Sequence, residues 1–342
     1  QPLASRDNRV ILRKMAQSTM QHFIEQANHY GKQRTPFFFL IDFEKEKPLI
    51  CPLENSAQQG IYFDILGKRN CTISPRPLPL NFTKHPMPFS HYQQGFELVQ
   101  SELQKGNSYL LNLTYPTEIS GNLSLEQIFH QTNAPYKLWL QDQFVCFSPE
   151  CFVNIHDNNI FTYPMKGTIN ATLPDAENQL LTNEKEQREH YTIVDLMRND
   201  LSMVAKNIQV KKFRYIDRIK TQKGEILQTS SEIYGKLNEN WQNQIGDILE
   251  KLLPAGSISG APKEKTTQII QQAEKQKRGY YTGIFGIFDG KTLQSAVAIR
   301  FISQVDEKFY FHSGGGITIH SNAQDEYEEL LEKVYLPIEG AD

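Results

Sequence analysis

The amino-acid sequence predicts an α+β fold built on large antiparallel sheets. Strand-like apolar runs come in clusters, as from Tyr136 to Tyr163, instead of alternating regularly with helices. Asp289-Gly290 stands between two apolar runs, and this dipeptide favours the tight turn that joins antiparallel strands. Long helical patterns are interspersed among the strand clusters, which is typical of α+β proteins. The 342 residues suffice to bury a sizeable core, as one large domain or two closely packed ones.

The clearest domain boundary is a proline-rich stretch from Ser74 to Ser90. Successive prolines exclude a helix and cannot donate hydrogen bonds within a sheet, so an extended connector is expected here. We therefore expect a short region at residues 1–82 that packs on a main domain at residues 83–342. Within the first region, a helix is expected at Val10–Tyr30 and strands at Pro36–Ile50 and Gly60–Leu66.

The main domain is expected to open with an amphipathic helix at His91–Gln104 and a strand at Tyr109–Tyr115. Asp175 to Met197 reads as one long helix. The Gly- and Ser-rich loop Pro254–Lys263 ends with a proline placed to open the next helix. Further elements are expected at Ile208–Arg214 and Ile226–Leu237 (strands), Trp241–Leu253 (helix), Thr292–Val305 and Lys308–His312 (strands) and about Ala323–Tyr335 (helix).

Composition excludes several classes of function. The net charge of −3 provides no basic field, so neither nucleic-acid nor anionic-membrane binding has electrostatic support. No stretch resembles a secretory signal or a membrane span, so a cytoplasmic location is expected; the chain does not begin with Met, which leaves its natural start open. The cysteines lack the CxxC spacing of zinc and redox sites and are expected to be reduced, structural thiols: Cys51, Cys71, Cys146 and Cys151.

Lys166 is the first candidate for chemistry. It ends an apolar strand pattern in Tyr163–Thr168, directly before a glycine that lets the chain approach a ligand closely. Such an amine is either a solvated strand-end charge or a nucleophile whose pKa is lowered by desolvation or neighbouring charge. An acid in Ser148-Pro149-Glu150 and two helices with carboxylates on one face favour the nucleophile.

The two acidic helices are candidates for binding a cation. Glu186 and Glu189 lie one turn apart on one face, as do Glu326, Glu329 and Lys333 on the last helix. Either helix alone could present a solvated acidic face. Two such helices beside one pocket would instead suit Mg²⁺, which takes one or two carboxylates and keeps several waters.

Two further features could hold an anion. Gly314–Gly316 reads as a turn between a strand and a helix, and its bare N–H groups could also cradle a carboxylate or phosphate. Arg300 ends the apolar run Ser295–Arg300; it is either structural or solvated, or its planar fork binds a carboxylate with two hydrogen bonds.

Six motifs occur in a recognisable order between about His91 and the C-terminus. They are Ser148-Pro149-Glu150, Pro164-Met165-Lys166-Gly167-Thr168, Ile193–Asp200, Gly256–Lys263, Ile299-Arg300 and Ser313–Ile317. In this order they resemble the motifs of the chorismate-utilising enzymes. Within that family the aminodeoxychorismate synthases (component I, the para-aminobenzoate synthase large subunit) are most similar, because many of them carry lysine at the position of Lys166.

The resemblance implies a fold, a reaction and a set of site residues. The fold would be a sandwich of large antiparallel sheets with flanking helices, with residues 83–342 as the chorismate-binding catalytic domain. Lys166 would be the nucleophile that adds to chorismate, and Glu150 the acid that protonates the departing hydroxyl. Mg²⁺ would be held by Glu189 and Glu329, with Glu186 and Glu326 acting through water. The substrate-binding residues would be Gly167, Thr168, Gly260, Ala261, Arg300, Gly315, Gly316 and Lys333.

The implied product is 4-amino-4-deoxychorismate, a precursor of para-aminobenzoate and folate, formed with ammonia. Because no cysteine has the glycine-flanked context of a glutaminase nucleophile, a separate glutamine amidotransferase subunit is implied as the partner. Two alternatives stay open: an anthranilate synthase component I, which would also eliminate pyruvate, and a catalytically silent subunit that binds chorismate.

Departures from the family pattern motivate the silent alternative. Leu110 stands where relatives have Gln or a water-activating Lys, and Gln228 stands where they often have His. Ile287 is expected to replace a substrate-contacting Tyr, and Cys151 replaces an Arg. Without the lysine base at the position of Leu110, water is not expected to be the nucleophile.

Overall fold

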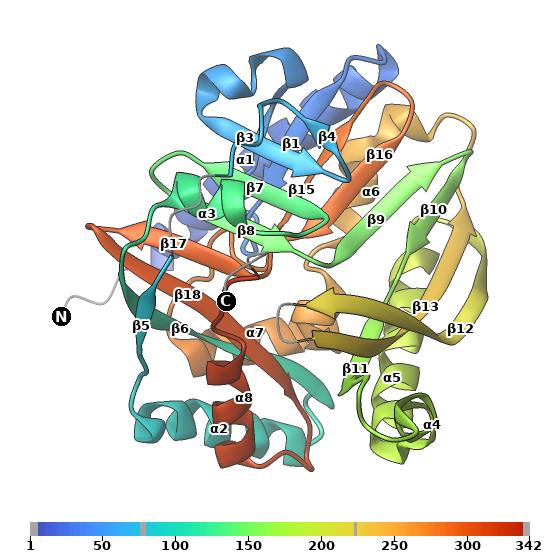
Figure 1. Ribbon diagram of the computed structural model, residues 1–342. Helices are drawn as coiled ribbons and strands as arrows, with labels where there is room; N and C mark the ends of the chain where they lie inside the picture. Colours follow the sequence, from blue (N-terminus) through green and yellow to red (C-terminus); the bar gives the residue numbers. More distant parts are fainter. Residues whose placement is uncertain (1–5, 76–79, 222–223, 338–342) are drawn as a thin grey trace.

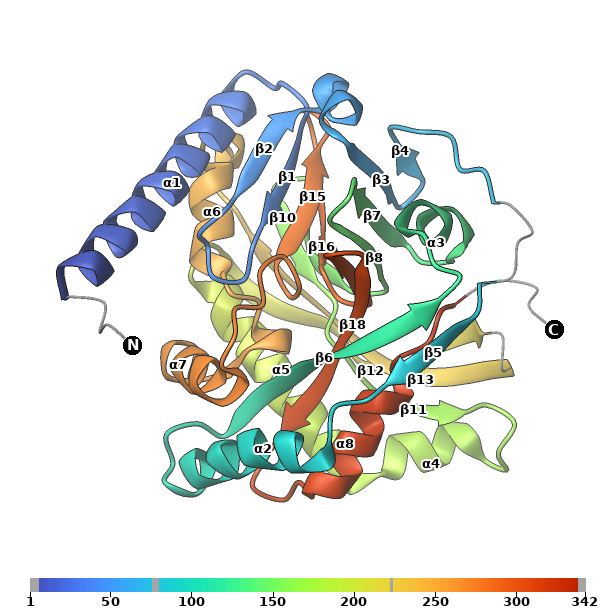
Figure 2. The ribbon, with the colours of Figure 1, turned by 90° about the vertical axis from the view of Figure 1, so that its left-hand side faces the viewer.

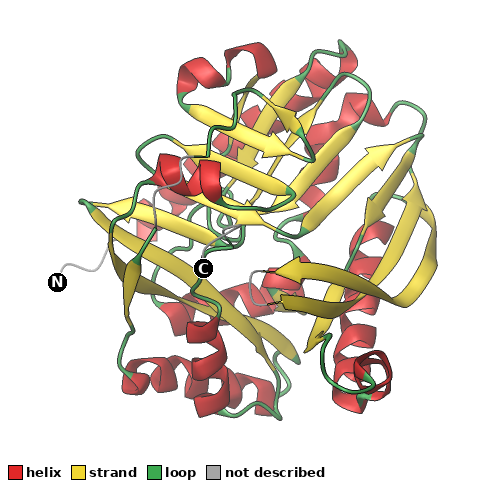
Figure 3. Ribbon diagram, in the orientation of Figure 1, coloured by secondary structure: helices red, strands yellow, loops and turns green. Residues whose placement is uncertain are grey.

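The computed structural model describes residues 6–75, 80–221 and 224–337, and of residues 6–18, 166–168, 219–221 and 224 it describes the backbone alone. In these ranges the chain forms two nine-stranded sheets with helices around them (Figures 1 and 3). Every strand pair within the described residues is antiparallel. The predicted α+β class with large antiparallel sheets is therefore confirmed.

The first sheet gathers strands from the start, middle and end of the sequence. Its hairpin β15–β16 turns at Asp289-Gly290, where the Asp289 carboxylate accepts a hydrogen bond from the Thr292 N–H at 2.7 Å, as the dipeptide predicted. In order of pairing, its strands are β11 (Met165–Asn170), β13 (Gly224–Lys236), β10 (Asn159–Thr162), β9 (Cys151–His156), β16 (Leu293–Val297), β15 (Ile284–Phe288), β1 (Phe37–Ile41) and β2 (Leu49–Pro52), with β12 (Lys206–Thr221) paired to β13.

The second sheet is built around the long pair β6 and β18, which run antiparallel over nine paired positions, from Phe309 opposite Ile119 to Ile317 opposite Leu111. In order of pairing, its strands are β14 (Gly260–Ala261), β6 (Leu110–Gly121), β18 (Lys308–Ile317), β17 (Phe301–Val305), β8 (Phe144–Ser148), β7 (Tyr136–Leu140), β3 (Ile61–Ile65) and β4 (Lys68–Arg69), with β5 (Phe82–His85) paired to β6.

Strand β1 shows why the core forms between the sheets. Successive side chains of a strand point to opposite faces, so a strand that is apolar throughout can be buried on both. Phe38 and Leu40 join a cluster shared by both sheets, whereas Phe37, Phe39 and Ile41 pack on the other face, toward the helices. All five side chains are fully buried.

The helices cover the outer faces of the sheets. Helix α1 lies along α6, and α2, α7 and α8 gather beside β6 and β18 (Figure 2). None of the helices in the described ranges is both long and apolar enough to cross a membrane. The helices are α1 (Arg6–Lys32), α2 (Phe89–Gln104), α3 (Leu125–Gln131), α4 (Ala176–Thr182), α5 (Glu184–Ser202), α6 (Ile245–Leu252), α7 (Lys263–Glu274) and α8 (Ala323–Glu332), with 3₁₀ turns at Leu53–Asn55, Ala57–Gln59, Trp241–Gln244 and Gly256–Ile258.

The N-terminal region supplies strands to both sheets. Strand β1 pairs with β15 in the first sheet, and β3 pairs with β7 in the second. The proline-rich connector leads into β5 and α2, and its residues 76–79 lie outside the described ranges. The domain boundary at residue 82 stays a prediction.

Three expected elements are divided in the structure. The long helix predicted at Asp175–Met197 is interrupted at Asn183, whose side-chain oxygen accepts a hydrogen bond from the Glu186 N–H at 3.0 Å and so begins α5 as an N-cap. The stretch Pro36–Ile50 forms β1, a turn and the start of β2 instead of one strand. The run Thr292–Val305 is broken between β16 and β17.

The chain crosses between the sheets at two neighbouring points. Pro149 and Glu150 join β8 of the second sheet to β9 of the first, and residues 298–300 join β16 of the first sheet to β17 of the second. These two crossings place side chains at the gap between the sheets, where the candidate site lies.

Candidate active site

A cavity of about 550 Å³ lies beside the two crossings. Its volume is within the range of small-molecule sites. Segments from both sheets and from helices α5 and α8 contribute to its wall. The lining residues are Asn112, Pro149, Glu150, Met165, Lys185, Glu186, Glu189, Ile193, Gln228, Ser257, Ile258, Tyr281, Ile299, Arg300, His312, Ser313, Gly314, Gly315, Gly316, Glu326, Glu329 and Lys333.

Glu150 is held in the cavity wall by its backbone. Its N–H donates to the Ser148 hydroxyl at 3.1 Å, and its carbonyl accepts from the Val297 N–H at 3.1 Å. Its side chain is half-buried. A carboxyl group fixed in this way can serve as a proton donor to a ligand in the cavity.

Arg300 enters the cavity from the other crossing. Its φ of +53° lies in the left-handed region, which residues other than glycine seldom adopt, and such strain clusters at functional sites. Its carbonyl accepts from the Phe147 N–H at 3.0 Å, and its guanidinium lies 5.7 Å from the Tyr335 ring centroid. The strained turn keeps a guanidinium fork available at the wall, which suits a carboxylate.

The acidic side chains of α5 and α8 meet at this cavity. Glu186 and Glu189 come from α5, and Glu326 and Glu329 from α8. Burial, together with the nearby Glu329 and Glu189 carboxylates, raises the pKa of Glu326 to about 7. The nearby Lys333 and Lys185 ammonium groups lower the pKa of Glu326, but the upward shift from burial is larger.

These carboxylates fit a divalent cation that retains its own waters. No group of three or more acidic, His or Cys side chains in the described ranges is already placed to hold a metal ion. Mg²⁺ needs only one or two carboxylates and completes its octahedron with water and ligand oxygens. The raised pKa of Glu326, caused first by burial and then by the neighbouring Glu329 and Glu189 carboxylates, fits such an ion.

The three glycines form a strand, which corrects the predicted turn. Gly314, Gly315 and Gly316 belong to β18 and pair with β6. A Cβ atom on Gly315 would lie 3.3 Å from Glu326 Oε2 and 3.8 Å from Glu329 Oε1, so glycine leaves room for the acidic side chains.

Lys333 connects the acidic helix to this strand. Its Nζ donates to the Gly314 carbonyl at 2.7 Å and lies 3.2 Å from Glu329 Oε1. The predicted residues Arg300, Gly315, Gly316 and Lys333 thus lie in one wall.

Lys166 belongs to β11, where its backbone lies opposite Thr229 and the register shifts before Thr168. The side chains of Lys166, Gly167 and Thr168 lie outside the described part of the structure. The residue before Lys166, Met165, lines the cavity, so the motif borders it.

Gly260 and Ala261 are predicted substrate-binding residues that do not line the cavity. They form the short strand β14, which pairs with Leu110 and Leu111. A Cβ on Gly260 would lie 2.0 Å from the Leu110 carbonyl oxygen, so the glycine serves this close backbone approach. Ser257 and Ile258, earlier in the same loop, line the cavity instead.

Tyr281, His312 and Asn112 line the cavity and were not predicted. Burial raises the pKa of the Tyr281 phenol and lowers the pKa of His312 to about 4, so both side chains are neutral near pH 7. The Nε2 atom of His312 lies 2.9 Å from the Ser303 hydroxyl. No local pattern indicated these residues, because tertiary packing brings them together.

The departures from the family pattern fall in different places. Gln228 lines the cavity, whereas Leu110 does not. Ile287 is fully buried in the cluster between the sheets, so the expectation that it occupies a substrate-contacting position is wrong; a tyrosine, Tyr281, is already in the wall. Cys151 follows Glu150 in the chain and lines a second, smaller hollow instead of the main cavity.

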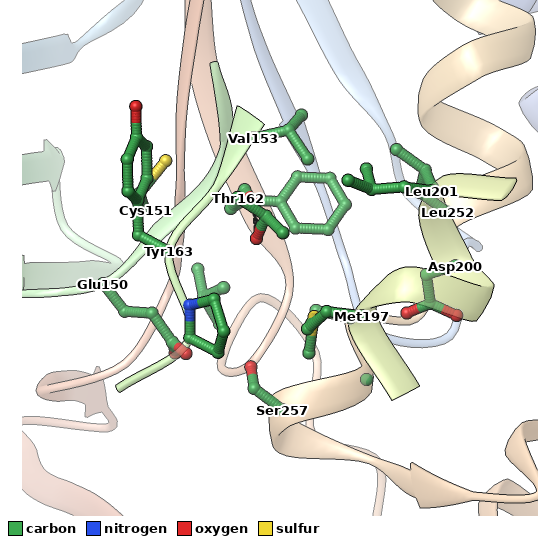
Figure 4. A pocket seen from close by; sticks show the side chains of 15 residues that line it. Glu150, Cys151, Val153, Thr162, Tyr163, Met197, Asp200, Leu201, Leu252 and Ser257 are labelled. Carbon is green, nitrogen blue, oxygen red and sulfur yellow. Dashed lines mark hydrogen bonds between the residues drawn. The ribbon is translucent and has the colours of Figure 1, made fainter. Parts of the chain in front are cut away.

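A second hollow of about 20 Å³, roughly the space of one water, shares Glu150 and Ser257 with the main cavity. Figure 4 shows Glu150 and Tyr163 on one side of it, with Met197 and Asp200 from α5 on the other. The Asp200 carboxylate pairs with Lys263 at 3.1 Å, while burial raises its pKa.

A profile of chorismate binding enzymes matches residues 22–339, which include every described residue that lines the cavity. The chain belongs to the chorismate-binding enzyme family. The two-sheet architecture is therefore that of a chorismate-binding enzyme.

Relatives with related names support this assignment. A PabA-like protein of Haemophilus influenzae is 98% identical over 328 residues, covering 96% of this chain and 100% of the relative. Aminodeoxychorismate synthase component 1 of Bacillus subtilis is 31% identical over 259 residues, covering 71% of this chain and 54% of the relative. The chain thus spans about half the length of that second relative.

Among solved structures, anthranilate synthase component I from Streptococcus pneumoniae superposes with a TM-score of 0.63 and 26% sequence identity. The match covers 76% of this chain and 60% of that one. The fold of this chain is therefore similar to that of a known chorismate-utilising enzyme.

Proposed function

We propose that this chorismate-binding enzyme converts chorismate and ammonia into 4-amino-4-deoxychorismate. The observation that carries the proposal is the position of the lysine-containing motif. Met165, the neighbour of Lys166, lines the same cavity as Glu150, Arg300 and the acidic faces of α5 and α8. A nucleophile, an acid, an anion-binding fork and a cation site would then share one space. The similarity to aminodeoxychorismate synthase component 1 supports this choice of reaction.

Substrate binding would balance the two carboxylates of chorismate against positive groups. Burying a dianion is costly unless each charge is paired. Arg300 would take the enolpyruvyl carboxylate with its fork, aided by the Gly316 N–H and Lys333. Glu189 and Glu329 would hold Mg²⁺, with Glu186 and Glu326 acting through water. When bound, the ion would supply the positive charge that holds the ring carboxylate.

The chemistry would follow from the conjugated diene of chorismate. The Lys166 amine adds at C2, the double bond shifts, and the C4 hydroxyl leaves as water after taking a proton from Glu150. Because hydroxide is a poor leaving group, this proton is worth roughly a hundred- to ten-thousand-fold in rate. Ammonia then adds at C4, the double bonds shift back, Lys166 is expelled as the free amine, and the new ammonium group returns a proton to the Glu150 carboxylate. The net change is replacement of hydroxyl by amine with release of water.

Ammonia would come from a partner glutamine amidotransferase. A glutaminase cysteine must form a thiolate readily. Burial raises the pKa of the Cys51 thiol to about 11 and of the Cys151 thiol to about 12, and also raises that of Cys146. Burial likewise raises the pKa of Cys71, so none of the four suits the role. A place in para-aminobenzoate and folate synthesis, in the cytoplasm, follows from this reaction.

Anthranilate synthase component I is the second candidate, favoured by the similarity of the fold to the Streptococcus pneumoniae enzyme. The lysine of the Pro164–Thr168 motif favours the first. A silent chorismate-binding subunit is the third candidate, motivated by Gln228 in the cavity wall. The joint presence of Glu150, Arg300 and the acidic side chains in that wall favours an active enzyme instead.

Incubation of the purified chain with chorismate, Mg²⁺ and ammonium tests the three candidates together. Aminodeoxychorismate retains the enolpyruvyl group and is identified by its mass, whereas anthranilate lacks that group and fluoresces. Binding of chorismate without turnover would identify a silent subunit and overturn the proposal.

A further inference from the structure

Arg278 is buried next to residues that line the cavity, and its side chain is only 3% exposed. It follows α7 and pairs with Glu274, whose side chain is 2% exposed, through Nε to Oε1 at 2.9 Å and Nη2 to Oε2 at 2.7 Å. The guanidinium also lies 4.5 Å from the centroid of the Phe43 ring. Arg278 itself is not among the residues that line the cavity.

The remaining N–H donors of this guanidinium bond to three segments of the chain. Two of these segments line the cavity, and the third adjoins a residue that lines it. Nη2 donates to the Asn112 carbonyl at 2.6 Å, and Nη1 donates to the Ile258 carbonyl at 2.7 Å and to the Thr282 hydroxyl at 3.3 Å. Asn112 and Ile258 line the cavity, and Thr282 follows the lining residue Tyr281. With the two bonds to Glu274, all five N–H donors of an arginine are used.

Thr282 connects the hydrogen-bond network of Arg278 to the turn at Arg300. It has a φ of +62°, a genuine outlier for a β-branched residue, which persists only where its surroundings hold it. Its N–H donates to the Ala298 carbonyl at 2.7 Å, two residues before Arg300. The strained turn at Thr282 and the strained turn at Arg300 are therefore joined through one hydrogen bond and a short stretch of chain.

Glu274 anchors the same network to the long strand β6. Its Oε2 accepts from the Thr114 N–H at 3.1 Å, and its Oε1 accepts from the Thr114 hydroxyl at 3.2 Å. Thr114 lies two residues after Asn112, so the ion pair fixes α7 against the part of β6 that borders the cavity.

We propose that Arg278 is a positioning residue for substrate binding, because its five hydrogen bonds fix Asn112, Ile258 and the Tyr281-Thr282 turn relative to one another. The inference rests on the proposed function, since it assumes that chorismate is the ligand of the cavity. Lysine could retain the charge beside Glu274 but could not serve three separate acceptors with a rigid fork. Misplacement of site groups by about 1 Å can cost on the order of a hundred-fold in rate.

The test compares Arg278→Lys with a variant that loses stability elsewhere. Ile128 is fully buried in α3, in a cluster on the outer face of the second sheet, and Ile128→Ala serves as the control. Thermal unfolding establishes how far each variant is destabilised. The dissociation constant for chorismate is then measured by calorimetry in the presence of Mg²⁺ and without ammonia, with Arg300→Lys as a variant expected to weaken binding directly.

Arg278→Lys is expected to raise the dissociation constant by about ten-fold or more. Ile128→Ala is expected to leave it within about two-fold at a comparable loss of stability. If Arg278→Lys binds as the unmodified chain does while Arg300→Lys does not, the positioning role is overturned and the proposed function stands. If the unmodified chain does not bind chorismate, the proposed function fails and the inference with it.

A second pair of variants covers the case in which Arg278→Lys does not fold. Thr282→Val removes the hydroxyl that accepts from Arg278 while retaining a branched side chain of similar size. Thr282→Ser retains the hydroxyl. Weaker chorismate binding by Thr282→Val than by Thr282→Ser supports the proposal, and equal binding by the two overturns it.

Discussion

Glu150 and Arg300 are tied to each other's crossing strand by reciprocal backbone hydrogen bonds. The N–H of Val297, three residues before Arg300, donates to the Glu150 carbonyl, and the N–H of Phe147, three residues before Glu150, donates to the Arg300 carbonyl. The two crossings between the sheets thus form one unit. The backbone therefore fixes the proposed proton donor, Glu150, relative to the proposed anion-binding residue, Arg300.

Glu150→Gln should lower the turnover number by roughly a hundred- to ten-thousand-fold, because the amide cannot protonate the departing hydroxyl. The dissociation constant for chorismate should stay within about two-fold, since the amide has nearly the same shape. Steady-state kinetics and calorimetry measure the two quantities. Glu126→Gln, a surface change in α3, is the control. A turnover number equal to that of the control would exclude Glu150 as the acid.

Lys166→Ala should abolish ammonia-dependent formation of 4-amino-4-deoxychorismate while chorismate binding persists, because the covalent step needs the amine. Lys166→Arg is the matched comparison: it retains the charge but lacks a nucleophilic amine, and should also be inactive. Product formation is followed by mass. Undiminished turnover by the alanine variant would refute covalent catalysis.

Gly315→Ala should weaken Mg²⁺ binding, because the added Cβ would lie 3.3 Å from Glu326 Oε2 and displace the acidic side chains. Gly67→Ala is a useful control, since its Cβ would meet nothing within 4 Å, although its φ of +85° makes alanine strained there. We expect Gly67→Ala to lower stability by about 1 kcal/mol without changing Mg²⁺ affinity. Calorimetric titration with Mg²⁺ measures the affinity of both variants. If Gly315→Ala binds Mg²⁺ as tightly as Gly67→Ala does, the cation lies elsewhere.

Mg²⁺ affinity should rise with pH up to about 7, because burial and the Glu329 carboxylate raise the pKa of Glu326 from 4.5 to about 7. Between these values the folded chain retains a proton that the unfolded chain has lost. Stability without metal should therefore fall as pH rises through this window. Binding of the cation must expel that proton, so affinity at pH 6 should be about ten-fold weaker than at pH 8.

The matched variant for this titration is Glu326→Gln, which cannot titrate. Its Mg²⁺ affinity should be weaker than that of the unmodified chain but should vary less between pH 6 and pH 8. These two pH values lie about one unit on either side of the Glu326 pKa. An equally steep pH dependence in both proteins would assign the titration to another group.

Much of the fold followed from local signals. The dipeptide Asp289-Gly290 predicts the hairpin that the structure contains. The continuous apolar run Phe37–Ile41 is typical of a strand that is buried on both faces, as it is here. The break at Asn183 also has a local signal, because an Asn three residues before a Glu is typical of a helix start. The break before Arg300 had none, because the chain changes sheets within one apolar run.

The candidate site was predictable where the chemistry lies in motifs. Glu150 and Arg300 belong to two of the motifs, and the glutamates recur on one face of each of two helices; all of them line one cavity. Tyr281 and His312 could not be found in this way, since only packing between β18 and the segment after α7 brings their rings to 5.0 Å. Gly260 conforms to a motif for a structural reason, the close approach to the Leu110 carbonyl.

The most direct test of the proposed reaction is the mass of the product formed by the purified chain from chorismate, Mg²⁺ and isotopically heavy ammonium. We expect 4-amino-4-deoxychorismate carrying the heavy nitrogen, with the enolpyruvyl group retained. Recovery of unchanged chorismate, or of a product without the label, would contradict it.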